Sequence, residues 1–533
     1  MSLATVQTRA KLGIQAPAVS VEVHLSNGLP AFHIVGLPET AVKESKDRVR
    51  SAIINAHFDF PARRITVNLA PAELPKEGTR FDLAIAIGIL AASGQVPTDL
   101  LEQYEFIGEL ALSGELRSVE AVLPSALGCA ANQKQLIIST SNANEAALVD
   151  SLTVLPANHL LEVSAHLHQR ESLQPWQPTA TILEEHGPQL NEVIGQDHAK
   201  RALEIAASGG HHLLFYGPPG TGKTMLASRL PGLLPPLSSM EALEVAAIHS
   251  VAGKIGRGSL NTNAKANSKF NSKFNSKFNS RVNSRANVNS AVHSRNRPFR
   301  TPHHSASAAA MVGGGSTPKP GEISLAHQGV LFLDELPEFQ RQVLEVLREP
   351  LESGEIIISR VAAQICYPAK FQLIAAMNPC PCGYLGSQRC ICTPDQIARY
   401  RTKVSGPLMD RIDLQVQVSA IENHQLLDQK DQPTGESNQI IQQRVCNARR
   451  VQIQRQGKIN AELSSRELQQ LCPLNPEQRT LMDQAINRFA LSTRGFYRVL
   501  KVARTLADLA GLEWPDIPQY QEALSYRSAI NPK

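Results

Sequence analysis

Residues 217–224 combine glycines, a lysine and a threonine at the spacing of a phosphate-binding loop. They read GPPGTGKT, which fits the pattern G-x4-G-K-[ST], and they lie between the apolar run LLFY and the helix-like run MLASRL. In such a loop backbone N–H groups surround phosphate oxygens, Lys223 reaches the β- and γ-phosphates, and Thr224 offers a hydroxyl to Mg2+. The sequence therefore predicts a site for ATP or GTP. Its residues are Gly217, Pro218, Pro219, Gly220, Thr221, Gly222, Lys223 and Thr224.

Two carboxylates follow a second apolar run. This run, GVLFL, ends directly before Asp334 and Glu335 and reads as a buried strand. We expect Asp334 to hold Mg2+ through water and Glu335 to polarise the attacking water. The alternative is a pair of acids at the start of a helix, which favour that position for electrostatic reasons alone.

Four of the eight cysteines are clustered in one short loop. Cys380, Cys382, Cys390 and Cys392 form C-x-C-x7-C-x-C. Four thiolates at this spacing suit tetrahedral Zn2+ in a structural site, because no coordination position is left for catalysis. Since C-x-C is less common in zinc sites than C-x-x-C, free thiols and a redox pair remain as alternatives.

The positive charge of the chain is concentrated in one interval. No acidic residue occurs between Glu244 and Glu322, whereas twelve Lys and Arg do, in a chain with a net charge of +5. The interval includes a repeat of the tetrapeptide Asn-Ser-Lys-Phe at 267–290, and we expect a disordered basic insertion at about 258–296. It is interpreted either as a neutral expansion that loops out of the fold or as a tether that adds nonspecific affinity for DNA.

The elements that must position these residues fall into several units. Short alternating runs predict an α+β unit first, and from Leu190 helix and strand patterns alternate as in a parallel sheet. No apolar run is long enough to span a bilayer, and the N-terminus lacks the pattern of a signal peptide, so we expect a cytoplasmic protein without membrane contact. The expected units are 1–172 (α+β domain), 173–189 (linker), 190–424 (ATPase core), 425–515 (helical lid) and 516–533 (tail).

The chain resembles AAA+ ATPases and, more narrowly, the magnesium-chelatase-like ComM/YifB family. The resemblance covers nearly the whole chain apart from the repeat. The stretches that carry it are VIGQDHAKRALEIAASGGHHLLFYGPPGTGKT, RPFRTPHHSASAAAMVGGGS, GEISLAHQGVLFLDELPEF, AAMNPCPCGY, SGPLMDRIDLQV and STRGFYRVLKVARTLADL. It implies an α/β fold in which a P-loop core with a parallel sheet is followed by a helical lid. It also implies ATP and Mg2+ as cofactors and a hexameric ring of identical subunits.

The resemblance also assigns roles to single residues. Asn378 lies at the sensor 1 position that orients the attacking water, and Arg411 lies at the position of an arginine finger that acts on a neighbouring subunit. Arg494 matches sensor 2, with Arg498 as the weaker choice, and Ile194 joins the nucleotide-binding residues.

Three further assignments rest on the same resemblance. ESGEIIISRVAAQICYPAKF looks like a pre-sensor hairpin, and we take Arg360 at its tip as a DNA contact. The N-terminal unit resembles the Lon protease domain (the ribosomal S5 domain 2-like fold), but Arg80 occupies the position of its serine nucleophile, so we expect no peptidase activity and consider Arg80 as a phosphate contact. His303 and His304 are expected to be structural, with metal binding as the alternative.

These assignments favour one function over two alternatives. The leading hypothesis is an ATP-hydrolysing ring that acts on single-stranded or branched DNA as a helicase and promotes branch migration in natural transformation. The alternatives are the ATPase subunit of a magnesium chelatase or a protein-remodelling ATPase, and a nucleotide-gated scaffold without catalysis. An intact Glu335 argues against the scaffold, because a switch can lose its catalytic carboxylate.

Overall fold

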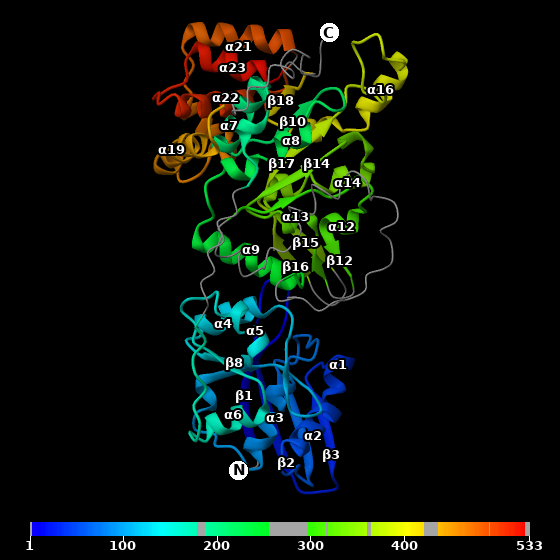
Figure 1. Ribbon diagram of the computed structural model, residues 1–533, viewed down its shortest axis with the longest axis vertical. Coiled ribbons are helices and arrows are strands. Elements are labelled where there is room, and N and C mark those ends of the chain that lie inside the picture. Colours follow the sequence, from blue (N-terminus) through cyan, green and yellow to red (C-terminus); the bar gives the residue numbers. More distant parts are fainter. Residues whose placement is uncertain are drawn as a thin grey trace.

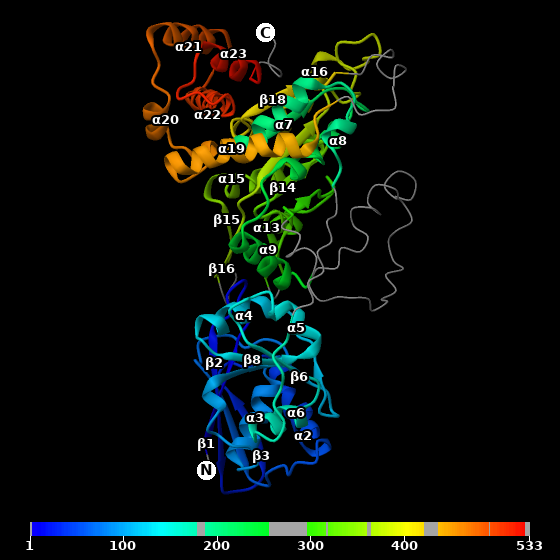
Figure 2. The ribbon, with the colours of Figure 1, turned by 60° about the vertical axis from the view of Figure 1, so that its left-hand side comes forward.

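The protein is an elongated molecule with three successive regions (Figure 1). The structure, a computed structural model, describes residues 3–177, 187–254, 296–315, 318–359, 364–419, 435–489 and 491–527. The repeat at 267–290 and Arg360 lie outside these ranges. The N-terminal region lies at one end, the P-loop core in the middle and the C-terminal helices at the far end, as a second view also shows (Figure 2). Within the described ranges, no helix has both the length and the apolar character needed to cross a membrane.

The N-terminal region is built on a mixed sheet of seven strands. The strand order is β3-β4-β2-β1-β5-β8-β9, in which β1–β2 and β2–β4 are antiparallel and the other pairs are parallel. The strands are β1 (Leu3–Arg9), β2 (Ala18–Ser26), β3 (Ala31–Val35), β4 (Arg64–Ala70), β5 (Tyr104–Ile107), β8 (Gln135–Ser139) and β9 (Val154–Ala157). The helices of eight or more residues are α2 (Ser45–Asn55), α3 (Asp82–Ala92), α4 (Val122–Ala131) and α6 (Leu160–Leu167), and α5 (Thr140–Ala146) is shorter. Every residue of α3 is buried, so this helix forms the centre of the core, and the region combines strands and helices as the alternating runs predict.

The central region contains the parallel sheet that the sequence predicts. Its strand order is β11-β14-β17-β10-β18, and all four neighbouring pairs are parallel. These strands are β11 (Phe299–Arg300), β14 (Val330–Leu333), β17 (Gln372–Met377), β10 (Leu213–Tyr216) and β18 (Leu414–Gln417). All residues of β10, β14 and β17 are buried, as expected for strands covered on both faces. Because the strands are parallel, their carboxyl ends meet at one edge, where ligands bind in open α/β sheets.

Helices and two small hairpins surround this sheet. The helices are α7 (Asp197–Gly209), α8 (Lys223–Ala227), α9 (Ser239–Val251), α12 (Ala308–Val312), α13 (Glu322–Leu325), α14 (Arg341–Val346), α15 (Pro350–Ser353), α16 (Pro394–Thr402) and α17 (Gly406–Met409). The hairpins are β12 (Gly313–Gly314) with β13 (Lys319–Pro320), and β15 (Glu355–Ser359) with β16 (Gln364–Pro368). The second hairpin lies where the sequence indicates a pre-sensor hairpin, and its buried face, which includes Ile365 and Tyr367, packs close to Gly13 of the N-terminal region.

The C-terminal region is helical and extends further than expected. Its helices are α19 (Asn438–Gln456), α20 (Ser465–Leu471), α21 (Pro476–Phe489), α22 (Thr493–Leu509) and α23 (Ile517–Ser525). The expectation of a tail from 516 is wrong for α23, because Asp516 caps this helix and Tyr520 is fully buried. Tyr526 also accepts a backbone hydrogen bond of 2.8 Å from Gln415 of β18, which ties the end of the chain to the central sheet.

Candidate nucleotide site

The glycine loop of residues 217–224 connects β10 to α8 at the carboxyl edge of the sheet. Gly220 and Gly222 have φ values of +77° and +85°, which residues with a side chain rarely adopt, so the loop depends on glycine at both positions. Lys223 lies within this loop, and its Nζ donates to the carbonyl oxygens of Gly217 and Pro218, each at 2.7 Å. Burial lowers the pKa of Lys223, whereas the carboxylates of Asp334 and Glu335 raise it.

Lys223 is also bonded to the residue predicted as sensor 1. Its Nζ donates to Asn378 Oδ1 at 3.1 Å. Asn378 follows β17, which lies beside β10 in the sheet, and Tyr216 at the end of β10 is paired with Met377. The parallel register therefore brings Asn378 next to the phosphate loop, although 155 positions separate it from Lys223 in the sequence.

The two residues predicted as magnesium ligands are in direct contact. Thr224 Oγ1 donates to Asp334 Oδ2 at 2.6 Å, and Asp334 Oδ1 accepts from the backbone N–H of Glu335 at 2.9 Å. A hydroxyl and a carboxylate oxygen are the ligands that Mg2+ prefers, and water completes its octahedron. These side chains therefore fit the ion that the sequence predicts.

Glu335 has an unusual backbone and a partner that the sequence did not reveal. Its φ of +53° is in the left-handed region, a position that costs energy for a residue with a side chain and is found at functional sites. Its Oε2 lies 3.3 Å from Nδ1 of His304, in the loop after β11. The ring of His303 packs 4.0 Å from that of His304. His304 thus lies against Glu335 in the candidate site.

The predicted arginine finger occupies a different place from the phosphate loop. Arg411 is 6 % exposed, donates to the Pro407 carbonyl at 2.7 Å and forms an ion pair with Glu352. It lines a cleft of about 360 Å3 together with Glu345, Arg348, Glu349, Glu352 and Ser353. In the part of the chain that the structure describes, neither Arg411 nor Arg494 forms a hydrogen bond or an ion pair with residues 217–224.

Arg494 lies near Arg411, although the two come from different regions. Burial lowers the pKa of Arg411, and the positive charges of Arg348 and Arg494 lower it further, against the opposing effect of Glu352. Arg494 is exposed in the first turn of α22, whereas Arg498 forms an ion pair with the buried Asp413. Arg498 therefore has a structural partner, and Arg494 is the one available to a ligand.

The sequence predicts two other site residues, Ile194 and Arg360. Ile194 is half-buried just before α7, and no hydrogen bond of its backbone to the glycine loop is recorded in the described ranges. Arg360 follows β15 and lies outside the described residues.

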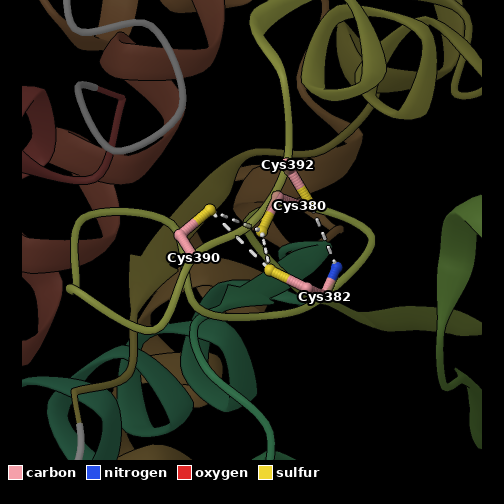
Figure 3. A group of neighbouring side chains, drawn as sticks. All are labelled: Cys380, Cys382, Cys390 and Cys392. Carbon is pink, nitrogen blue, oxygen red and sulfur yellow. Dashed lines mark hydrogen bonds between the residues drawn. The ribbon is translucent and has the colours of Figure 1, made fainter.

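The four clustered cysteines converge on one point (Figure 3). All four Sγ atoms lie within 4.8 Å of one another, and among the described residues this is the cluster whose ligand atoms could hold a metal ion. Backbone N–H groups of Tyr384 and Ile391 lower the pKa of Cys382 to about 6, whereas desolvation and hydrogen bonds among the thiols raise the pKa of Cys390 and that of Cys392. The loop could therefore bind a metal.

Arg80 does not have the exposure that a DNA contact requires. It is 3 % exposed, and its guanidinium donates to Ser125 Oγ at 3.1 Å and to the carbonyl oxygens of Glu120 (2.5 Å) and Ala121 (3.2 Å). Burial lowers its pKa to about 10, so it stays charged at neutral pH. The idea of Arg80 as a phosphate contact is wrong, because its donors are used inside the N-terminal region.

Three family models together match most of the chain. The model of the magnesium chelatase subunit ChlI matches residues 189–274 and 272–426, that of subunit ChlI of Mg-chelatase matches residues 21–142, and that of the ChlI C-terminal part matches residues 435–527. All the predicted nucleotide-site residues up to Arg411 fall within the first match, and Arg494 falls within the third.

Relatives that match over their full length identify the family more closely. The chain is 49 % identical over 539 aligned residues to Competence protein ComM of Haemophilus influenzae, covering 99 % of this chain and 98 % of the relative. It is 48 % identical to protein YifB of Escherichia coli, covering 99 % and 97 %. The magnesium-chelatase 38 kDa subunit of Rhodobacter capsulatus is 24 % identical over 193 residues, which cover 36 % of this chain and half of the relative. The family implies ATPase activity with ATP and Mg2+, and the site described above has the residues for it. The chain belongs to the magnesium-chelatase-like ComM/YifB family of AAA+ ATPases.

Proposed function

We propose that this protein is a cytoplasmic, ATP-driven DNA motor, a helicase that promotes branch migration when incoming DNA recombines during natural transformation. The observation that carries the proposal is an assembled site, with Lys223 bonded to Asn378 and Thr224 bonded to Asp334, in a chain half identical to Competence protein ComM over nearly its full length. The name of that relative supports the competence role. The DNA motor is our inference from the site, the charge distribution and the resemblance.

Each of the described side chains has its own role in ATP hydrolysis. Lys223 binds the phosphates that the glycine loop surrounds, and Thr224 and Asp334 hold Mg2+, which when bound offsets charge on the phosphate oxygens. Glu335 polarises the attacking water, and Asn378, fixed by Lys223, orients it. His304 fixes the carboxylate of Glu335 from the side of β11.

A ring of identical subunits accounts for the arginines that lie apart from the glycine loop. Arg411 lines a cleft of about 360 Å3, the positive charge of Arg494 acts on Arg411, and neither arginine is bonded to the loop of its own chain in the described ranges. We propose that both face the nucleotide of the next subunit, where a fixed cation stabilises the charge that spreads over the γ-phosphoryl oxygens. A closed ring, which we propose to be a hexamer, gives every site such a neighbour.

DNA would be held through its backbone in the centre of this ring. The β15–β16 hairpin supports the proposal because its two strands pair in register, and Arg360 lies between them in the sequence, outside the described residues. A basic residue at such a tip contacts phosphates without reading sequence. The basic repeat is a second candidate contact, and deleting residues 261–294 tests it. Lower DNA affinity with a smaller salt dependence supports the tether, and unchanged affinity across a salt series excludes it.

ATP-dependent displacement on forked and four-way DNA junctions tests the motor. The comparison is between the wild type, Lys223→Ala, which removes the phosphate contact, and Glu335→Gln, which keeps nucleotide binding but removes the base. We expect the wild type to resolve the junctions and both variants to lose this activity. ATP hydrolysis that DNA does not stimulate and that does not remodel the DNA would contradict a DNA motor. It would favour a chelatase subunit, to which a third of the chain is similar.

A further inference from the structure

The arrangement of the four sulfur atoms matches a tetrathiolate metal site. Cys380 Sγ lies 3.3 Å from Cys382 Sγ and 3.9 Å from Cys390 Sγ, and the last two are 3.7 Å apart. A tetrahedron with Zn–S bonds of about 2.3 Å has S···S edges of about 3.8 Å. Disulfides require about 2.05 Å, so these atoms are grouped as metal ligands are and not as bonded pairs.

The fourth cysteine closes the same loop. Cys392 Sγ accepts from the backbone N–H of Cys382 at 3.4 Å, and such N–H···S bonds orient a thiolate toward a metal. Cys392 directly precedes Thr393, whose side chain caps α16. The cluster therefore joins the segment after β17 to the start of a helix.

This loop also packs against the phosphate loop. Gly383, one residue after Cys382, has a φ of +83°, and a Cβ added there would lie only 2.6 Å from Cδ of Pro219. The loop begins at Asn378, which accepts a hydrogen bond from Lys223 and lies two residues before the fully buried Cys380. One short segment thus contacts the glycine loop and carries sensor 1.

We propose that Cys380, Cys382, Cys390 and Cys392 bind one Zn2+ and that this metal positions Asn378 and Pro219 in the nucleotide site. Four thiolates fill a tetrahedral ion, so the metal takes no direct part in hydrolysis. Without it, the thiolates repel one another and the loop loses the link between its two Cys-x-Cys segments, so that Asn378 and the glycine loop are held less firmly. The inference rests on the ATP hydrolysis of the proposed function and is independent of the DNA motor.

Metal content and ATP hydrolysis of the full-length protein are measured together. Cys390→Ser/Cys392→Ser removes two ligands, and Cys446→Ser on α19 is the matched control for loss of a thiol. Mass spectrometry of the purified proteins should find one zinc per chain in the wild type and in the control, and less than about a tenth of that in the double variant. No metal in the wild type, or iron in place of zinc, overturns the site.

A second variant separates the metal from its effect on the nucleotide site. Gly383→Ala keeps all four thiols, but its methyl group collides with Pro219 and its backbone is strained. We expect it to keep its zinc and to lose about tenfold in kcat for ATP, as the double cysteine variant does, because small misplacements of positioning groups are costly. Normal kcat in the zinc-free, folded double variant overturns the positioning role. If the wild type itself hydrolyses no ATP, the proposed function fails, while zinc content still decides the metal site.

Discussion

Nδ1 of His304 lies 3.3 Å from Oε2 of Glu335, across the gap between the loop after β11 and the end of β14. The carboxylate of Glu335 is half exposed, and its backbone is in the left-handed region, so His304 is the side chain that fixes where it points. Phe339 lies edge-on to the imidazole, with the ring centroids 6.5 Å apart. We therefore predict that His304 positions the carboxylate proposed to polarise water.

Replacing His304 should affect turnover and not nucleotide binding. We expect His304→Ala to lower kcat for ATP by roughly ten- to a hundredfold with little change in KM, because misplacing a catalytic group by about 1 Å costs this much. His304→Asn, which can still hydrogen-bond Glu335, should recover part of the loss, whereas His303→Ala should have a smaller effect. Steady-state kinetics with and without DNA check this. Faster hydrolysis in His304→Ala would mean that the contact restrains Glu335 instead of positioning it.

Mixing two inactive variants should restore hydrolysis if Arg411 acts on a neighbouring subunit. Lys223→Ala lacks a working phosphate loop but keeps Arg411, and Arg411→Ala has the reverse defect. In rings assembled from equal amounts, roughly a quarter of the interfaces combine an intact loop with an intact Arg411, so that share of wild-type ATPase activity is expected. The double variant Lys223→Ala/Arg411→Ala, mixed in the same way with Arg411→Ala, should give none. Absence of recovery in the first mixture would show that Arg411 acts within its own chain or only stabilises it through Glu352.

The parts of the site that could be predicted from the sequence are those whose functional residues lie close together in one motif. The glycine loop and the acids after GVLFL are each flanked by the elements that place them, and a parallel sheet then brings their strand ends together. Strong apolar runs such as those of α3 and β14 were predictable for the same reason, since their burial follows from their composition.

Contacts between distant segments could not be predicted in this way. His304 and Glu335 meet because β11 pairs with β14, and nothing in the spacing of TPHHS and LDE indicates that pairing. The burial of Arg80, considered from the sequence as a phosphate contact, depends on acceptors supplied by a segment forty positions away. The burial of α23 depends on its packing against α22 and α21.

Removing the Arg80 side chain should destabilise the N-terminal region without weakening DNA binding. Arg80→Met leaves the carbonyl oxygens of Glu120 and Ala121 without these donors, at a cost of about 2 kcal/mol. Thermal melting of the full-length protein should show a lower first transition, and fluorescence anisotropy should show unchanged affinity for labelled DNA. Arg63→Met makes the same change at an exposed position of the same region and should leave melting unchanged. Weaker DNA binding by Arg80→Met at an unchanged melting temperature would contradict the buried role.

The stability of the ATPase core should fall as the pH drops from 7 to 5, with His212 as one cause. Burial lowers the pKa of His212 to about 4, and its Nδ1 accepts the backbone N–H of Leu373 at 3.0 Å, a bond that the protonated ring cannot accept there. In the unfolded chain the pKa is about 6.5, so the unfolded state takes up the proton first. The stabilisation is thus present above pH 6.5 and is lost as the pH falls toward 4, by about 2 kcal/mol at pH 5.

Asparagine at position 212 separates this titration from packing. The amide oxygen in His212→Asn can accept the N–H of Leu373 but does not titrate, so the melting temperature should fall less between pH 7 and pH 5 than in the wild type. Part of the dependence should remain, because burial lowers the pKa of His249 to about 4 as well. His24→Asn, at an exposed position of β2, should retain the full dependence. Equal pH slopes in His212→Asn and the wild type would show that His212 is not protonated preferentially in the unfolded chain.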